Sequence, residues 1–426
     1  MPTSNLRRTA ILAVGVAAWL PLAAAAQAPA IEVVTFEAAV QRAIASNLTV
    51  ERASAAVLGA EALLAQARAA VRPTAGGTAL VTVLDGERGF SGNVVQPRTQ
   101  LTLGGSVDVP VLAAAGWAAR TQAADQVAIA GITVNDIRRQ VGVAAAQAYL
   151  NIVTAKRQLE VNLRARDTAK AQLDYATARR EGGVGSRLNE ERAAQELAVN
   201  EELVERTQLQ VALGQEALGR LLAADHPVDA AEAPALETPA ADGEQWWLAR
   251  TDIRLFDARL NAQQRVVDDS RLDWVPSVGA SFQPQYITPS GLFQPSGTWR
   301  ALLSANVPLF DSGQRRAVRA RRTADLNLFK VDRRDAELSA KSEVRIARAT
   351  IDAEARALTR SREAASHAAE VLRITDVAFR AGATTNIELV DAQRRARDAE
   401  SAVASAEDRA RSARLALLVA LGRFPG

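Results

Sequence analysis

Two hydrophobic patterns alternate along the chain, and the whole alternation occurs twice. Apolar residues at helical spacing predict long helices at 36–72, 113–181 and 188–222, and again at 246–274, 313–380 and 386–421. Between them lie segments in which apolar and polar residues alternate strictly, as in half-buried strands: 75–84, 99–109, 277–287 and 298–309. The run 113–181 contains no proline. It predicts a helix roughly 100 Å long, which no compact domain needs.

The second half of the chain repeats the first. Pro73 matches Pro276, and Pro110 matches Pro308, at an offset of about 200 residues. We therefore expect a signal peptide at 1–26, a first repeat at 27–223, a linker at 224–244 and a second repeat at 245–426. In each repeat, the combined length of the two shorter helices is close to the length of the long helix. Short helices stacked end to end are therefore expected to flank each long one, which predicts a rod.

Each repeat has a tight reversal between its last two helices. Gly183 and Gly382 mark the end of one helix, and Ser186 and Thr385 can cap the next by accepting from a free backbone N–H. In the second reversal, Thr385 and Glu388 have the spacing of a capping box. The first reversal contains a weaker version of this capping box. Both turns are therefore predicted to be well-defined helical tips.

The N-terminus has the pattern of an export signal. Arg7 and Arg8 precede an apolar run at 9–22, and three alanines at 24–26 offer a cleavage site. No later stretch approaches the roughly 20 apolar residues of a transmembrane helix. If the mature chain meets a membrane, it must therefore do so with strands.

Composition excludes several classes of function. Aromatic residues are only 4% of the chain although 48% of it is hydrophobic, which favours thin helix-on-helix packing. The chain has no cysteine and two histidines, His226 and His367, and neither has the setting of a catalytic residue or metal ligand. Without Arg7 and Arg8, 49 basic residues face 48 acidic ones, so no nucleic-acid partner is indicated. We expect no enzyme activity, cofactor or metal.

The four predicted strands can be read in two ways. Each has one apolar and one polar face and is long enough to cross a bilayer in a barrel. A half-buried soluble sheet would alternate equally well. Four strands cannot close a barrel, and open edges are not stable in lipid. The export signal and the polar face favour several chains that pool their strands.

The duplicated pattern resembles the TolC family of outer membrane factors. The resemblance rests on Asn-Leu-Thr-Val at 47–50 with Arg-Thr-Asp-Ile at 250–253, and on the strand ends 107–112 and 305–310. The two Gly-x-x-Ser/Thr reversals complete it, and it covers nearly the whole mature chain. It implies a mainly α fold with membrane β-hairpins: a homotrimer with a 12-stranded β-barrel in the outer membrane, continued by a periplasmic α-helical barrel.

The resemblance also implies a function and partners. The protein would be the exit duct of a tripartite efflux system, passing small molecules from an inner-membrane pump and a periplasmic adaptor across the periplasm and outer membrane. One alternative is the outer-membrane component of a type I protein secretion system. Another is a periplasmic coiled-coil adaptor or scaffold, which would normally add lipoyl-like segments and an anchor.

Site residues follow from the resemblance at the tips. Family members carry two aspartates after the second reversal, at the positions of Glu388 and Asp391 here, where a trimer would place six carboxylates around the entrance. Both acids would also complement the helix macrodipole, and Glu388 fits the capping box. Thr384 stands where some members have a latching arginine, for which Arg187 is a candidate substitute. An adaptor would dock on the turns, formed by Gly183, Ser186, Gly382 and Thr385.

Overall fold

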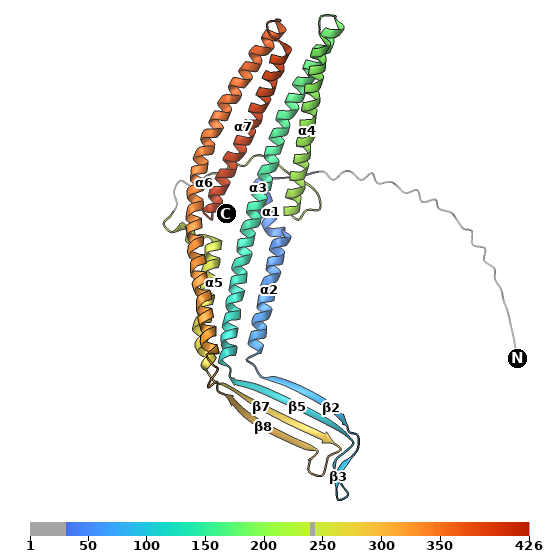
Figure 1. The fold of residues 1–426 in the computed structure, drawn as a ribbon, viewed down its shortest axis with the longest axis vertical. Helices are drawn as coiled ribbons and strands as arrows, with labels where there is room; N and C mark the ends of the chain where they lie inside the picture. Colours follow the sequence, from blue (N-terminus) through green and yellow to red (C-terminus); the bar gives the residue numbers. More distant parts are fainter. Residues whose placement is uncertain (1–30, 239–242, 426) are drawn as a thin grey trace, which may run out of the picture.

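The computed structural model describes residues 31–238 and 243–425. The molecule is a long helical arm with a four-stranded sheet at one end and two hairpin tips at the other (Figure 1). The signal peptide expected at 1–26 lies outside the described residues. None of the helices in the described parts of the chain is long and apolar enough to cross a membrane.

Long helices run along the arm in four columns. The first repeat contributes α1 (Phe36–Ser46), α2 (Leu48–Ala69), α3 (Ala114–Glu181) and α4 (Arg187–Leu221). The second contributes α5 (Thr251–Asp268), α6 (Gln314–Arg380) and α7 (Asn386–Ala420). Contacts place α3 between the α2/α4 column and the α5/α7 column, and α6 beyond α5 and α7. Two stacked columns therefore alternate with two continuous helices, as the helix lengths predict.

The helix expected at 36–72 is wrong as a single element. Its backbone leaves the helical region at Asn47 (φ −67°, ψ 130°), which separates α1 from α2. The Asn47 side chain accepts from Thr49 N (2.8 Å) and donates to the carbonyl of Leu221 (2.9 Å). Asparagine favours such a cap because its amide replaces missing backbone partners. The break also joins the start of α2 to the end of α4.

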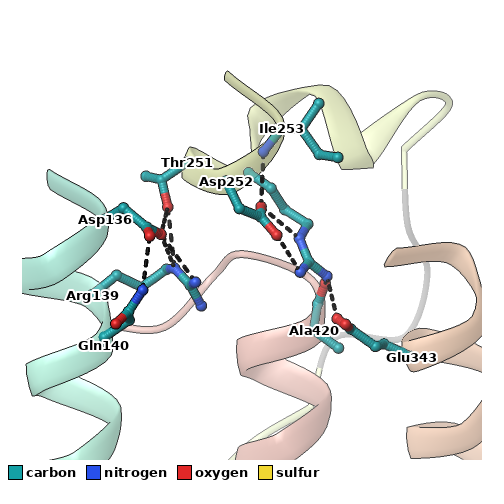
Figure 2. A network of polar contacts seen from close by, with 9 residues as sticks. Asp136, Arg139, Gln140, Thr251, Asp252, Ile253, Glu343 and Ala420 are labelled. Atoms are coloured by element: carbon teal, nitrogen blue, oxygen red, sulfur yellow. Dashed lines mark hydrogen bonds and ion pairs between the residues drawn. The ribbon is translucent and has the colours of Figure 1, made fainter. Parts of the chain in front are cut away.

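The helix expected at 246–274 is likewise divided. A 3-10 turn at Trp246–Ala249 precedes α5, and a second one at Asp269–Trp274 follows it. The break before α5 is at Arg250, whose extended backbone (φ −64°, ψ 138°) matches that of Asn47 in the first repeat. Arg250 Nη1 donates to the carbonyl of Ala420 (2.9 Å), so this junction joins the start of α5 to the end of α7 (Figure 2).

The main sheet is antiparallel throughout, with the order β2-β5-β7-β8. Its strands are β2 (Thr74–Val83), β5 (Thr99–Leu112), β7 (Ser277–Thr288) and β8 (Gly297–Asn306). The predicted end of the second strand at 109 is wrong, because β5 continues through Pro110 to Leu112 across an irregularity in register. A bulge tolerates the missing proline donor. The fourth strand ends at Asn306 rather than 309, just before Pro308.

Two small sheets are absent from the sequence prediction. A hairpin of β3 (Arg88–Phe90) and β4 (Asn93–Gln96) extends the loop between β2 and β5. A parallel pair, β1 (Glu32–Val34) and β6 (Val228–Ala230), places part of the expected linker 224–244 beside the chain start. Beside this pair lies the main apolar core, where the buried Tyr149 packs edge-on against Phe36 and donates to the carbonyl of Glu232 (2.8 Å).

Candidate functional site at the tips and the sheet

Both tips end their first helix with the same backbone motif. Gly183 and Gly382 have positive φ (+75° and +76°), where a Cβ would be strained. Val184 N donates to the carbonyl of Arg179 (3.0 Å), and Ala383 N donates to that of Ala378 (2.8 Å). These bonds, with those from each glycine N–H, form Schellman motifs that satisfy the last carbonyls. The two turns therefore share one backbone conformation and one hydrogen-bond pattern.

The next helix at each tip begins with a side-chain cap. Ser186 accepts from Leu188 N (3.2 Å). Thr385 accepts from Glu388 N (3.4 Å), while the Glu388 carboxylate accepts from Thr385 N (3.0 Å), which completes the capping box. The hydroxyl of Thr384 donates to the same carboxylate. Glu388 is therefore held at the tip by hydrogen bonds, and within the described residues it forms no ion pair.

The other two charged residues that were predicted as site residues at the tips, Asp391 and Arg187, have partners on their own helices. Asp391 pairs with Arg395 one turn on (2.9 Å), and both side chains are more than half exposed. Arg187 pairs with Glu191 (3.5 Å) and is also strongly exposed. Within the described chain, no hydrogen bond or ion pair connects Arg187 to the second hairpin. The structure thus gives Arg187 no latching contact.

The two hairpins are linked by a different set of residues, which the sequence pattern did not predict. Glu196 on α4 is buried, with only 5% of its side chain exposed, and accepts from Arg394 Nε on α7 (2.7 Å). This hydrogen bond raises the pKa of the Arg394 guanidinium above its usual value. Arg397 donates to Asn200 (3.1 Å) one turn from Glu196. Polar residues on the inward side of α4 were the available signal, but the partner helix is not evident from sequence.

The seam between α3 and α7 is also polar. Four hydrogen bonds join side chains of the two helices: Thr154 with Asp408, Gln158 with Ser401, Arg164 with Glu400, and Gln172 with Asn386. A cleft of about 200 Å³ lies where α3, α4, α6 and α7 meet, lined in part by Arg164, Glu196 and Leu372. Hydrogen bonds and ion pairs therefore contribute to the contact between the hairpins, beside the apolar cluster that includes Leu415.

The sheet at the opposite end has two chemically different faces. Alternation and register place Val107, Phe282, Trp299 and Leu303 on one side, where the rings of Phe282 and Trp299 are in contact (5.9 Å between centroids). The other side carries mainly hydroxyl, amide and glycine residues, with Arg300 among them. Trp299 and Leu303 are 70% and 75% exposed. This apolar side therefore needs a cover that the single chain does not supply.

None of the described residues forms a group of three or more His, Cys, Asp or Glu that could hold a metal.

A search of curated proteins finds no match to the chain. Residues 245–423, the second repeat, match the family model described as outer membrane efflux protein. The matched residues form strands β7 and β8 and helices α5, α6 and α7.

Solved structures extend the similarity across both repeats. A membrane protein from Pseudomonas aeruginosa is 20% identical, with a TM-score of 0.79 over 91% of this chain and 93% of that one. The CmeC outer membrane channel of Campylobacter jejuni is 15% identical, with a TM-score of 0.79 over 91% and 85%. The open state of the Neisseria gonorrhoeae MtrE outer membrane channel is 18% identical, with a TM-score of 0.76 over 91% and 88%. The fold of these solved structures therefore covers both repeats of this chain.

Proposed function

We propose that the protein is the exit duct of a tripartite efflux system. In this proposal a homotrimer spans the outer membrane with its sheets and the periplasm with its helical arms. It passively conducts small molecules delivered by an inner-membrane pump through a periplasmic adaptor. The observation that carries the proposal is the open sheet, which has two unpaired edges and one exposed apolar face.

The edges of the sheet suit head-to-tail closure. The edge strands β2 and β8 run in opposite directions, because each neighbouring pair in the order β2-β5-β7-β8 is antiparallel. The β8 edge of one copy therefore fits the β2 edge of the next without breaking the alternation. Two copies would give eight strands, whose interior is filled by side chains, whereas three give twelve and leave room for a channel. Closure also removes every edge from lipid.

The outer helices support the same arrangement. Each of the outer helices α4 and α6 carries an exposed apolar stripe in addition to its buried side. On α4 the exposed residues Leu188, Val199, Leu209 and Leu213 lie opposite its own buried side. On α6 the exposed stripe lies opposite buried Leu326 and Val344 and consists of Leu328, Val331, Leu338, Ile346, Val371, Ile374 and Val377. Since α4 and α6 are the two lateral edges of the arm, neighbouring copies can pack these stripes together.

The tips complete the proposal. In a trimer, the α3/α4 and α6/α7 turns would point towards the inner membrane, so an adaptor would contact the surface around Gly183, Ser186, Gly382 and Thr385. Glu388 and Asp391 would surround the entrance and attract cations. Because Arg395 pairs with Asp391, Glu388 would contribute more of the net negative charge.

The test begins with outer-membrane fractions from cells that express the full chain. We expect an oligomer that migrates as a trimer without heating and as a monomer after heating, and that forms conducting channels in planar bilayers. Export of a small-molecule pump substrate should also require the protein in cells that contain its pump and adaptor. Recovery of the chain as a soluble monomer would overturn the proposal.

A further inference from the structure

The polar face of the sheet contains a hollow of about 480 Å³. It is centred on the paired row formed by Thr78, Gly104, Gln285 and Thr298, one residue from each strand. Its other polar wall residues are Thr102, Ser106, Gln283 and Arg300. Three glycines, Pro284 and Trp299 complete the lining. Hydrogen-bonding groups therefore surround the hollow on several sides.

Glycines make the hollow possible. A Cβ at Gly104 would come within 2.8 Å of the Thr78 hydroxyl oxygen, and a Cβ at Gly76 would lie 3.5 Å from that of Ser106. With hydrogen at both positions, the floor is backbone and the hydroxyls lie beside it. The surface is thus recessed in the part of the sheet nearest to Arg300.

Arg300 provides a positively charged group with free donors. It lies directly opposite Gln283 in the β7–β8 register, and its Nε donates to Gln283 Oε1 (2.6 Å). That bond orients the guanidinium. Its Nη1 and Nη2 groups make no hydrogen bond or ion pair within residues 31–238 and 243–425. These two nitrogens form the planar fork that binds carboxylate or phosphate oxygens in pairs.

One other ionisable residue lies on the same face of the four main strands. Asp108 is paired with Thr74 and Ser281, so it is two strands and two residues from Arg300, or about 12 Å at ordinary strand spacings. No ion pair joins the two in the described chain. Asp108 is also outside the lining of the hollow, which therefore has a net positive charge.

We propose that this hollow is a transit site for oxyanions, in which Arg300 binds a carboxylate or phosphate and the surrounding hydroxyls and amides bind the rest of the solute. The inference rests on the proposed trimer, in which the polar face lines the channel. Three copies then place three guanidinium groups at one level of the lumen. Their positive charge is opposite in sign to the acidic residues at the tips, so the duct has regions of both charges.

The experiment uses the full trimer in planar bilayers. Under a KCl gradient, Arg300→Gln should shift the reversal potential towards cation selectivity. Citrate and inorganic phosphate, added separately, should reduce the wild-type current, whereas glucose should not. We expect half-inhibition of R300Q to need roughly tenfold more citrate, the effect of losing one paired charge-assisted contact. A response to citrate alone would assign the site to carboxylates, and a response to both anions to oxyanions in general.

Two further variants separate charge from geometry. Arg300→Lys keeps the charge but loses the fork, so it should preserve the reversal potential and still weaken citrate inhibition. Asp108→Asn should shift selectivity towards anions and leave citrate inhibition nearly unchanged. Trimers of each variant are checked by their heat-dependent migration.

The outcomes distinguish this inference from the proposed function. If the wild type forms no conducting trimer, the proposed function fails. If the wild type conducts but R300Q and R300K match it in reversal potential and citrate inhibition, only the oxyanion site fails. Equal inhibition by glucose would also overturn the site, because blocking would then depend on size rather than charge.

Discussion

At the scale of single residues, Glu388 serves both the fold and the proposed entrance. Its carboxylate accepts from Thr385 N and from the Thr384 hydroxyl, which holds it at the start of α7. Negative charge there also complements the helix macrodipole. Asp391 lies three residues beyond Glu388, outside the capping box, and has Arg395 as its partner. The two acids therefore differ in how much charge they leave exposed to a passing ion.

Neutralising the tip acids should lower cation selectivity. For the double variant Glu388→Gln and Asp391→Asn, we expect a reversal potential closer to zero in planar bilayers under a KCl gradient, because six negative charges leave the entrance. Glutamine keeps the capping geometry. The exposed ion pair of Asp391 contributes about 0–1 kcal/mol, so folding should change little.

A matched acid away from the turn controls for general charge effects. Glu370 is exposed on α6 and pairs with Arg373, and Glu370→Gln should leave the selectivity nearly unchanged. An identical reversal potential in the double variant and the wild type would remove the entrance role from Glu388 and Asp391.

Capping chemistry was the most predictable part of the tips. Glycine, hydroxyl and carboxylate at fixed spacings bond to backbone atoms a few residues away, so the sequence contains both partners. The pairing of Glu196 with Arg394 spans two hairpins, and many arginines on α6 and α7 have suitable spacing. Only the packing angle between the hairpins selects the partner. Local contacts could therefore be predicted, and the link between hairpins could not.

At the scale of elements, the junction near Arg250 holds four helices together. The Arg250 side chain is only 8% exposed and pairs with Asp252 (2.7 Å) and with Glu343 on α6 (2.7 Å). Beside it, Asp136 on α3 accepts from Thr251 (3.0 Å) and pairs with Arg139 (Figure 2). Burial alone would raise the pKa of Asp252, but the hydrogen bonds and charge of Arg250 outweigh it and hold that pKa below its usual value.

Because of the Asp252 carboxyl group, this junction should make the free energy of unfolding depend on pH under acidic conditions. A carboxyl group with a lowered folded-state pKa stabilises the fold above its unfolded value of about 4, and this contribution is lost as pH falls through the folded value. We expect Asp252→Asn to lose about 1–3 kcal/mol at pH 7, since Arg250 keeps only part of its pairing. The difference from wild type should shrink as pH approaches 3.

Thermal unfolding of purified protein across this pH range measures the effect. Asp225 is fully exposed, so Asp225→Asn should follow the wild type at every pH. A constant difference between D252N and the wild type from pH 7 to pH 3 would contradict the assignment to ionisation of Asp252.

The breaks in the helices could not be predicted from the hydrophobic pattern. The apolar spacing of 36–72 continues through Asn47, and that of 246–274 continues through Arg250, so periodicity predicts one helix in each case. Each break is stabilised by a carbonyl at the end of another helix, Leu221 or Ala420, far along the chain. The long helices α3 and α6 could be predicted because nothing interrupts their pattern and no remote partner is required.

At the scale of the whole molecule, the outer stripe of α6 should control assembly without controlling the fold of one chain. Leu338 and Ile346 are 57% and 63% exposed and lie away from the side that packs on α5 and α7. Charging both with Leu338→Asp and Ile346→Asp would put carboxylates into a dry contact between copies. We expect the heat-sensitive trimer band to disappear while the helical circular dichroism of the detergent-solubilised chain is kept.

The control lies on the flank of the same helix. Thr350 is exposed and its hydroxyl bonds only to its own helix, at the carbonyl of Ile346. Thr350→Asp should therefore leave the trimer intact. Normal trimers in the double variant would show that α6 does not face a second copy.

The alternation of continuous and stacked columns also has a mechanical consequence. At the level of Asn47 and Arg250, α3 and α6 are the only described helices whose backbone is unbroken from the arm's tip half to its sheet half. Tension along the other two columns passes through a few hydrogen bonds, including those to the carbonyls of Leu221 and Ala420. A partner that pulls or twists the tips would therefore strain this level first. The strands would keep their register while the arm yields.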